Sequence, residues 1–368
     1  MWTARPASAR WKSCAVSRNA ALCAFLALAA CGAPKPPAEL VAAQKAERQG
    51  DDQATLAAYE KAAASCHRVI DKAQRADACA QAYSGRALTL ERLGRDDDAL
   101  AAWLTMDKDL APAAPEDGAR ALHEAAVLEL RRGHDKAAYD LFWRVIVEHT
   151  ASPAADDALR VVVRDGRARN ARQLDGVLVQ LYERDKDSEL ADNLLAYRAD
   201  LAEHELAQPK GALEIWDQIA KRWPKGPFFD DACWNGARLA RATGDPRGAL
   251  ARLHKLLATK EEAIMIGSYH SVFLDDAALE AGRILRDDLG DGKAALVEFE
   301  RLEDPDFKDS ILRDDALFET AVTRAALGDA AAACATFATL RKKFPDSKYL
   351  SEPPAALAGC SGGAKAAR

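Results

Sequence analysis

The sequence predicts an all-α protein whose folded body is a solenoid of about eight antiparallel helix pairs. Alanine, the strongest helix former, dominates the composition, and the residues that favour strands are sparse. The same residue types also recur in register along the chain, which is typical of a repeat protein. In chain order we expect a signal segment (1–30), a tether (31–37), the solenoid (38–349) and a flexible tail of small residues (350–368).

The first thirty residues have the features of an export signal. A basic region without acidic residues precedes an apolar run over 20–30 that ends in small residues. This run of eleven residues is shorter than the roughly 20 that a transmembrane helix needs. It also lacks the polar face of an amphipathic core helix. The basic side chains are Arg5, Arg10, Lys12 and Arg18.

The end of the apolar run, Leu28-Ala29-Ala30-Cys31, resembles the bacterial lipobox. The resemblance implies that Cys31 is acylated and becomes the first residue of the mature chain; an ordinary signal cleaved near Ala30 is the alternative. Acyl chains hold a soluble body at a membrane, each buried CH₂ contributing about 0.8 kcal/mol. Gly32 in place of aspartate implies sorting to the outer membrane, facing the periplasm. The prolines of 33–37 then favour an extended tether.

Charge argues against a nucleic-acid partner. Loss of residues 1–30 removes four cations, so the net charge falls from −6 to −10. No basic cluster interleaved with aromatic residues is present, and an acidic body would repel phosphates.

Five cysteines remain in the body after Cys31. An exported protein meets an oxidising compartment, so pairing is plausible. Cys66 and Cys79 lie near the end of one expected helix and early in the next, and a bond between them would stabilise by about 3 kcal/mol. Cys334 and Cys360 could tie the tail to the last pair, whereas Cys233 is expected to be a buried small hydrophobe. None has CxxC spacing, so we expect no metal site.

The internal repeat becomes visible when the chain is aligned on a small residue that ends a helical stretch. These turn residues are Gly94, Gly133, Ala207, Gly244, Gly290 and Gly328. Five positions later stand alanines: Ala99, Ala138, Ala212, Ala249, Ala295 and Ala333. Nine positions later stand large apolar residues: Trp103, Phe142, Trp216, Leu253, Phe299 and Phe337. Twelve positions later stand Met106, Val145, Ile219, Leu256, Leu302 and Leu340.

Each column has a physical cause. Glycine ends the first helix because it adopts positive φ without steric cost. Alanine lets the second helix approach the first, and the two larger residues continue its apolar stripe. Seven before the turn most units have alanine, but two have Asp200 and Arg283, with Ala199 and Gly282 one place earlier. The units at Gly50 and near 168–169 fit least well.

This column order, with terminal Trp223-Pro224 and Phe344-Pro345, resembles the tetratricopeptide repeat over about 39–345. The resemblance implies a right-handed solenoid whose first helices line a concave groove. The chain is also similar to repeat lipoproteins of the bacterial envelope, including the repeat subunit of the outer-membrane β-barrel assembly machine and related periplasmic coordinators, but it is longer than that subunit. Several first helices open with an aspartate pair, such as Asp314-Asp315. We interpret these pairs as helix caps rather than calcium ligands, because no DxDxDG loop accompanies them.

By analogy with the family, residues 13, 10, 6 and 3 positions before each turn should face the groove. The candidate partner residues are Trp234, Arg238, Arg241, Tyr197, His204, Arg120 and His123, with Asp231, Leu194, Leu201, Val127 and Leu130 at neighbouring groove positions. Exposed aromatic and arginine side chains would anchor a partner segment. The alternative is that Trp234 and Tyr197 pack between neighbouring units. An apolar insertion around 263–267 could be a partner loop or an extended helix.

No catalytic constellation is found. His123-Glu124 and His204-Glu205 lack the second histidine of a zinc protease, and no GxSxG, GxxxxGK[ST] or GxGxxG occurs. We therefore expect no cofactor and no enzymatic activity. The predicted function is a membrane-anchored scaffold for an envelope protein partner; the alternative is a lipoprotein that binds a glycan or peptide.

Overall fold

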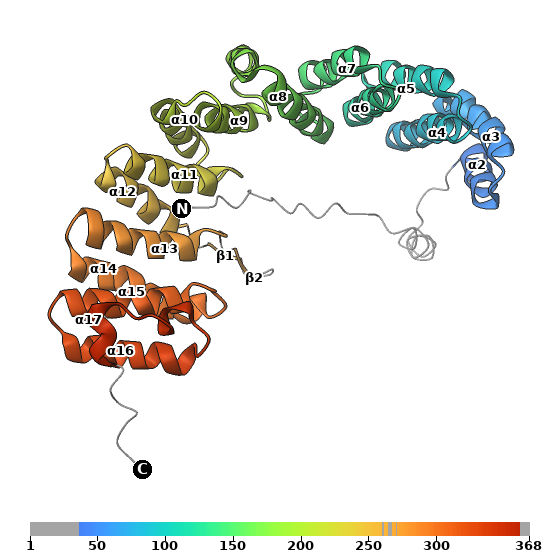
Figure 1. Ribbon diagram of the computed structural model, residues 1–368. Coiled ribbons are helices and arrows are strands. Elements are labelled where there is room, and N and C mark those ends of the chain that lie inside the picture. The colour runs from blue at the N-terminus through green and yellow to red at the C-terminus, as the bar shows by residue number, and fades with distance from the viewer. Residues whose placement is uncertain (1–36, 260, 264–266, 270, 361–368) are drawn as a thin grey trace. The chain divides into compact units, whose positions relative to one another are not determined.

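The computed structural model describes residues 37–259, 261–263, 267–269 and 271–360, which form successive helix pairs (Figure 1). The chain divides between Ala154 and Ala155 into two compact units, which we describe separately. The predicted signal segment, Cys31 and nearly all of the tether lie outside the described residues. Over the described ranges, no helix combines the length and the apolar character that crossing a membrane requires.

The first unit contains three helix pairs in which each helix packs on its neighbours in the chain. The pairs are α2 (Ala38–Gln49) with α3 (Asp52–Ser65), α4 (Lys72–Arg92) with α5 (Asp96–Leu110), and α6 (Pro115–Arg131) with α7 (Asp135–Glu148). A short 3₁₀ turn, η2 (Cys66–Arg68), connects the first pair to the second.

The second unit continues the pattern. Its helices are α8 (Pro153–Arg184), α9 (Ala191–His204), α10 (Pro209–Arg222), α11 (Phe229–Ala242), α12 (Pro246–Leu257), α13 (Leu274–Arg283), α14 (Gly292–Glu300), α15 (Arg313–Ala326), α16 (Ala330–Lys343) and α17 (Ala355–Ala358). The shorter elements are β1 (Glu261–Ala263), β2 (Gly267–Tyr269), η3 (Ile284–Asp288), η4 (Arg301–Glu303), η5 (Pro305–Phe307) and η6 (Lys348–Leu350).

The long helix α8 is a pair in its own right. Its backbone leaves the helical region at Asn170, where φ is −163° and ψ is 93°. The Asn170 side chain accepts from the N–H of Gln173, so it caps the second half of α8. The break lies one residue beyond the vague turn expected at 168–169. With α8 counted as two helices, the described residues contain eight pairs, and the predicted all-α solenoid is confirmed.

The residues of the turn column share one backbone conformation, with positive φ. Positive φ occurs at Gly50, Gly94, Gly133, Gly244, Gly290 and Gly328, and at one described non-glycine residue, Ala207, with φ 53°. The sequence alignment selected these same positions, apart from Gly50, whose unit fitted poorly. In that unit Thr55 and Tyr59 occupy the buried sites of the alanine and the large apolar residue. A left-handed residue is therefore what every one of these turns requires.

The three columns after the turn form the core of the helix pairs. All of their residues are buried, and Trp103, Phe142, Phe299 and Phe337 are among the largest fully buried side chains. At the small position before the turn of the seventh pair, Gly282 faces the Phe299 ring. A Cβ on Gly282 would lie 2.3 Å from the Phe299 ring, so this position accepts no side chain without a shift.

The fifth and seventh pairs carry one additional residue before the turn, which explains why their small residue stands one place earlier in the sequence. The second pair shows the ordinary turn. In the second pair the N–H of Arg95 bonds the carbonyl of Leu90, five residues earlier. In the fifth and seventh pairs the equivalent N–H reaches six residues back, from Gln208 to Ala202 and from Asp291 to Leu285. The seventh pair makes room by a π-helical turn, η3. The wider turn moves the small position to Ala199 and Gly282, both of which are buried.

The structure excludes one of the two alternatives left open for the insertion and corrects the expected start of the tail. The insertion between α12 and α13 is not an extended helix, because β1 and β2 pair as antiparallel strands with Ala263 opposite Gly267. The tail does not begin at residue 350. Helix α17 packs on α15 and α16, and the Leu357 side chain is fully buried, which closes the apolar end of the last pair. Residues 361–368 lie outside the described part of the chain.

Candidate functional site

Three predicted partner residues lie along α11, and all three contact neighbouring pairs. The Trp234 ring stacks on Phe273, with centroids 5.6 Å apart and planes 9° apart. The Arg238 Nη2 donates to Glu203 Oε2 on α9 at 2.6 Å. Arg241 donates to Glu280 on α13 at 2.5 Å. The structure thus places Trp234 between helix pairs, as the alternative interpretation of the sequence proposed.

The same stacking recurs two helix pairs later, where Phe318 of α15 stacks on Tyr349 with centroids 3.9 Å apart. Trp234 and Phe318 both stand three residues after an Asp-Asp pair, and Phe273 and Tyr349 both stand two residues after a serine. The first stack joins α11 to the residue before α13, and the second joins α15 to η6, which follows the last pair.

The candidates on α9 are affected by the wider turn of the fifth pair. Leu194 and Leu201 were expected to face the groove, but both are buried in the core because the extra residue rotates their register. Tyr197 is half-buried, and burial raises the pKa of its hydroxyl. His204 is exposed, and its Nε2 lies 3.3 Å from Asp200 Oδ1. Of the α9 candidates, His204 is therefore the one open to solvent.

Arg120 and His123 belong to the first unit, on α6. The Arg120 guanidinium is exposed and donates to Asp117 on its own helix at 2.9 Å. His123 is half-buried and lies edge-on to the Phe142 ring, with centroids 5.5 Å apart. Asp231, another groove position, is half-buried beside Asp230, and burial raises its pKa to about 6.

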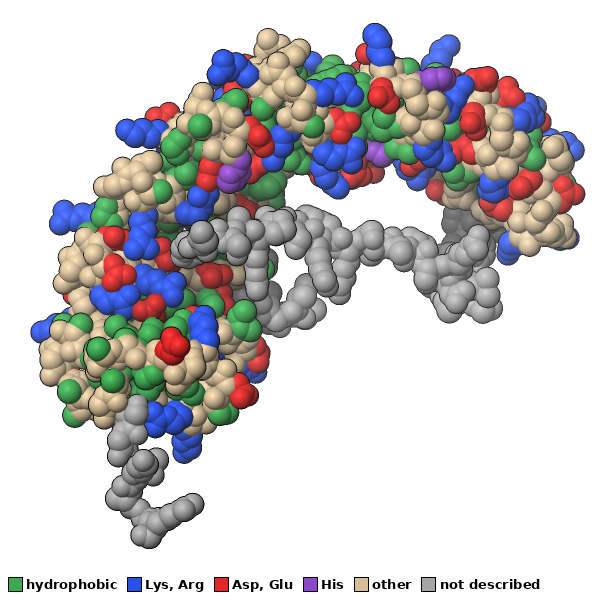
Figure 2. All heavy atoms as spheres, in the orientation of Figure 1, with side chains coloured by type: hydrophobic (Ala, Val, Ile, Leu, Met, Phe, Trp, Pro, Cys, Tyr) green, Lys and Arg blue, Asp and Glu red, His purple; other side chains and the backbone are tan. Residues whose placement is uncertain are grey.

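Ion pairs connect the first helices of consecutive pairs in the second unit. They are Arg167–Asp200, Arg238–Glu203, Arg241–Glu280, Arg241–Asp288, Arg283–Glu319 and Arg286–Glu319. Figure 2 shows the result on the visible surface, where acidic and basic side chains lie interspersed. A partner carboxylate would have to displace an existing partner from these arginines, so they are better suited to holding the pairs together.

The aspartate pairs also connect repeats. The carboxylates of Asp275 and Asp314 each accept the backbone N–H of the next residue, in the first turn of their helices. Each also accepts a hydroxyl from further along the chain: Ser310, in the loop before α15, donates to Asp275 at 2.7 Å, and Ser347, after α16, donates to Asp314 at 2.8 Å. Asp275 and Asp314 thus accept first-turn N–H groups, although the N-cap residues themselves, Phe273 and Leu312, make no side-chain cap bond. The serine contacts place the loop before α15 beside the start of α13, and the segment after α16 beside the start of α15.

Three loops that precede first helices expose an apolar residue at the same position; we call these residues the apolar rim, and the sequence analysis did not recognise them. The rim consists of Pro227, Val272 and Ile311, the exposed residues that directly precede Phe228, Phe273 and Leu312. Val272 is 80% exposed and Ile311 is 75% exposed. The signal that could have revealed it is the motif Ser-apolar-apolar-x-Asp-Asp, present before both α13 and α15.

The structure contains both disulfides that were suggested by the sequence. Cys66 is bonded to Cys79 and Cys334 to Cys360, while Cys233 is free and buried. Burial raises the pKa of the Cys233 thiol to about 11, so this group is unreactive at neutral pH.

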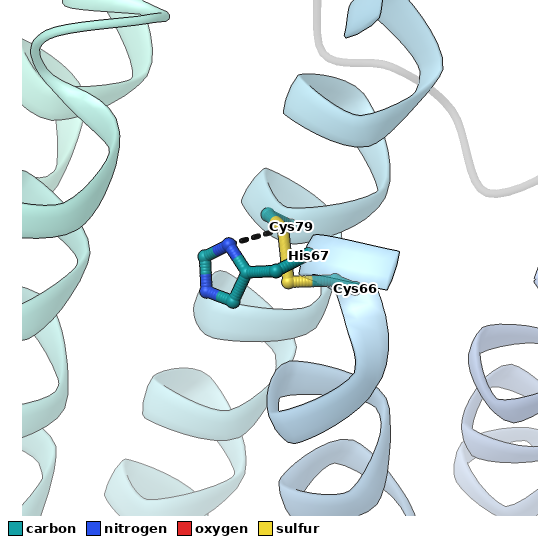
Figure 3. A group of neighbouring side chains, drawn as sticks. All are labelled: Cys66, His67 and Cys79. Atoms are coloured by element: carbon teal, nitrogen blue, oxygen red, sulfur yellow. Dashed lines mark hydrogen bonds between the residues drawn. A yellow bond between two sulfur atoms is a disulfide. The ribbon is translucent and has the colours of Figure 1, made fainter. Parts of the chain in front are cut away.

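A histidine accompanies the first disulfide, and this group was also missed. Figure 3 shows the His67 ring turned toward the sulfur atoms, with Nδ1 3.8 Å from Cys79 Sγ. Its Nε2 lies 3.3 Å from the Tyr83 hydroxyl, which donates to Asp109 at 2.8 Å. The ligand atoms of Cys66, His67 and Cys79 all lie within 4.8 Å of one another. The available signals were the Cys-His dipeptide and the one-turn spacing of Cys79 and Tyr83.

Comparisons with known proteins concern the fold. A family model described as tetratricopeptide repeat matches residues 315–347, which cover α15, α16 and the turn that follows. No curated protein matches the chain. The tetratricopeptide character of the fold therefore rests on residues 315–347 and on the columns that the other pairs share with them.

Several solved structures are similar at low identity. The crystal structure of MamA protein is 14% identical, with a TM-score of 0.38 over 54% of this chain and 94% of that one. PilW, described as a type IV pilus biogenesis factor, is 17% identical, with a TM-score of 0.34 over 74% and 96%. A tetratricopeptide repeat protein from Parabacteroides merdae is 13% identical, with a TM-score of 0.30 over 77% and 97%.

Proposed function

We propose that this protein is a non-enzymatic adaptor of the bacterial cell envelope, anchored by lipid at Cys31, whose solenoid docks a protein partner. Support for the anchor comes from the lipobox-like sequence. Support for the adaptor comes from the repeated helix pairs, which present the same surface position at regular intervals. The observation that carries the proposal is the apolar rim of Pro227, Val272 and Ile311.

The rim suits a partner better than the arginines of the first helices do. Apolar side chains in water gain about 25 cal/mol for each Å² that a partner covers. Arg238 and Arg241 already have carboxylate partners, so a new partner gains little from them. The equivalent positions before α9 and after α16 carry charged residues, Glu189 and Lys348. Apolar centres with a polar surround are typical of protein interfaces.

The alternative, a lipoprotein that binds a glycan or peptide, would need aromatic side chains open on one concave face. Trp234 is instead covered by Phe273, and Tyr197 is half-buried. No geometric feature of the described residues favours this function.

The adaptor is tested by crosslinking and pull-down of the lipidated protein from envelope membranes. The double variant Val272→Asp with Ile311→Asp should lose a specific partner that the wild type recovers. Val297→Asp is the matched control, because Val297 is also exposed, at 59%, but lies on α14 away from the rim.

A second double variant distinguishes partner binding in the groove from partner binding at the rim. Trp234→Ala with Arg238→Ala removes two predicted groove residues, so loss of the partner here, with retention in the rim variant, would assign binding to the groove. Recovery of every partner by both variants would refute docking on either surface.

The lipid anchor is tested by a separate variant. Cys31→Ser should release the protein into the soluble fraction, and retention in the membrane would contradict lipidation.

A further inference from the structure

The first unit contains a group of three potential metal ligands that the adaptor function does not use. Cys66 lies in η2, His67 follows it directly, and Cys79 lies in α4. Both sulfur atoms belong to buried residues, whereas His67 is exposed. The group therefore has a protected interior and one side open to solvent.

The hydrogen bonds around His67 determine which of its nitrogens carries a proton. The Tyr83 hydroxyl has one hydrogen and donates it to Asp109. Its oxygen can then only accept from His67, so Nε2 of the neutral ring carries the proton and Nδ1 has a lone pair.

The lone pair of Nδ1 consequently faces a sulfur atom that has nothing to donate. The two atoms are 3.8 Å apart, and a disulfide sulfur bears no hydrogen. In the oxidised protein this approach of two acceptors contributes no hydrogen bond. For the neutral ring, a proton on a reduced sulfur or a cation between the two atoms would satisfy both of them.

We propose that reduction of the Cys66–Cys79 bond converts this group into a Zn²⁺ site with Cys66, His67 and Cys79 as ligands. Thiolate sulfur and imidazole nitrogen are the ligands that zinc prefers. A tetrahedral ion with bonds of about 2.0–2.3 Å holds its ligand atoms about 3.5–3.8 Å apart. The Nδ1 to Sγ distance already has that value, and reduction frees the two sulfurs to separate.

The surroundings supply the outer contacts that zinc sites use. A histidine ligand usually donates its second ring N–H to an oxygen, which fixes the ring and its tautomer. Tyr83 accepts from Nε2 here and is itself held by Asp109. Three protein ligands leave the fourth position on the exposed side for water or a donor from a partner.

The chemistry requires an external dithiol as the reductant. The dithiol transfers two electrons to the Cys66–Cys79 bond and becomes a disulfide itself, and each cysteine sulfur takes one proton. Zn²⁺ then displaces both protons as it binds the two thiolates, while His67 binds as the neutral ring. The disulfide form of such a dithiol reverses the exchange: it accepts two electrons and two protons as the Cys66–Cys79 bond forms and Zn²⁺ is released.

Either state closes the same short loop of the chain. The disulfide joins residues 13 positions apart at the junction of η2 and α4. A zinc ion bound to the same cysteines would cross-link the same positions, so the loop stays closed in reducing surroundings. Restricting the unfolded chain in this way stabilises the first unit in both states.

Zinc binding is measured on the full-length chain, oxidised or reduced with a phosphine, by dialysis against Zn²⁺ and metal analysis. We expect one Zn²⁺ per reduced chain at this site and none there in the oxidised chain. Cobalt should produce the charge-transfer absorption of thiolate ligands. The thermal midpoint of the reduced protein should rise with Zn²⁺.

Variants assign the site. Cys66→Ser should abolish the bound equivalent, and Tyr83→Phe, which keeps all three ligands, should weaken binding about 10-fold or more. Cys334→Ser with Cys360→Ser is the matched control, because it removes the other reducible pair and should retain the ion. His67→Ala leaves the disulfide intact in the oxidised chain, so its fold can be verified before reduction. Equal zinc binding by reduced wild type and Cys66→Ser, or no binding by the folded reduced wild type, would overturn the proposal.

Discussion

Replacing Ala207 by glycine should stabilise the second unit. Ala207 has φ 53° at a turn where the equivalent residues of other pairs are glycine. An alanine in this left-handed region costs about 1–2 kcal/mol. Glycine removes that cost but gives the unfolded chain additional freedom, which lowers stability by about 0.4–1 kcal/mol. The difference is a gain of roughly 0.5–1 kcal/mol.

The reverse change, Gly244→Ala, should lose the same amount. A Cβ on Gly244 would have no atom within 4 Å, so the loss comes from the backbone alone and not from a clash. The two substitutions therefore test one physical cause with opposite signs.

Native-state hydrogen exchange is the appropriate assay, because repeat proteins can open in sections. Amides of α9 and α10 should exchange more slowly in Ala207→Gly, and those of α11 and α12 faster in Gly244→Ala. Ala335→Gly, at an exposed position inside α16, is the control and should destabilise by about 1 kcal/mol. If Ala207→Gly destabilises as much as this control does, the assignment of strain to Ala207 is refuted.

Three other changes test the core, the charge and the cap. Gly282→Ala places a Cβ 2.3 Å from the Phe299 ring and should lower the free energy of unfolding by about 1–3 kcal/mol, measured by urea denaturation. Asp231→Asn should stabilise above pH 6 by at most about 3 kcal/mol and have little effect below pH 4. The sign follows because a raised pKa in the folded state favours the protonated form, so stability is lost as pH rises through about 6; an equal effect at both pH values would contradict it. Cys360→Ser opens the bond to Cys334 and should cost about 3 kcal/mol, with earlier proteolysis after residue 350 as the second readout.

The periodic part of the fold was accessible from the sequence because each column has a local cause. Glycine at a left-handed turn and alanine at a close helix contact are needed wherever the motif occurs, so they recur at fixed spacing. The one-place shift at Asp200 and Arg283 was visible in the sequence, but its cause was not. It required the six-residue hydrogen bonds at Ala202 and Leu285, which depend on how the backbone accommodates an extra residue.

The candidate site was less predictable from the sequence, because its contacts join different helix pairs and have no local cause. Position in a helix indicates which face a residue lies on, but not which neighbour meets it there. By sequence Trp234 was compatible with an open groove and with a junction between units, and its contact with Phe273 comes from a loop 39 residues away. Arg241 likewise meets Glu280 and Asp288, neither of which its own helix reveals.

By itself the sequence determined the helical class, the number of pairs and the identity of the left-handed turns, since these follow from residue types within one helix pair. Contacts between pairs were decided by the tertiary structure alone: the stacking of Trp234 on Phe273, the apolar rim at Val272 and Ile311, and the approach of His67 to the Cys66–Cys79 bond. These contacts join residues whose separation in the chain has no fixed value, and side-chain packing decides which of them meet.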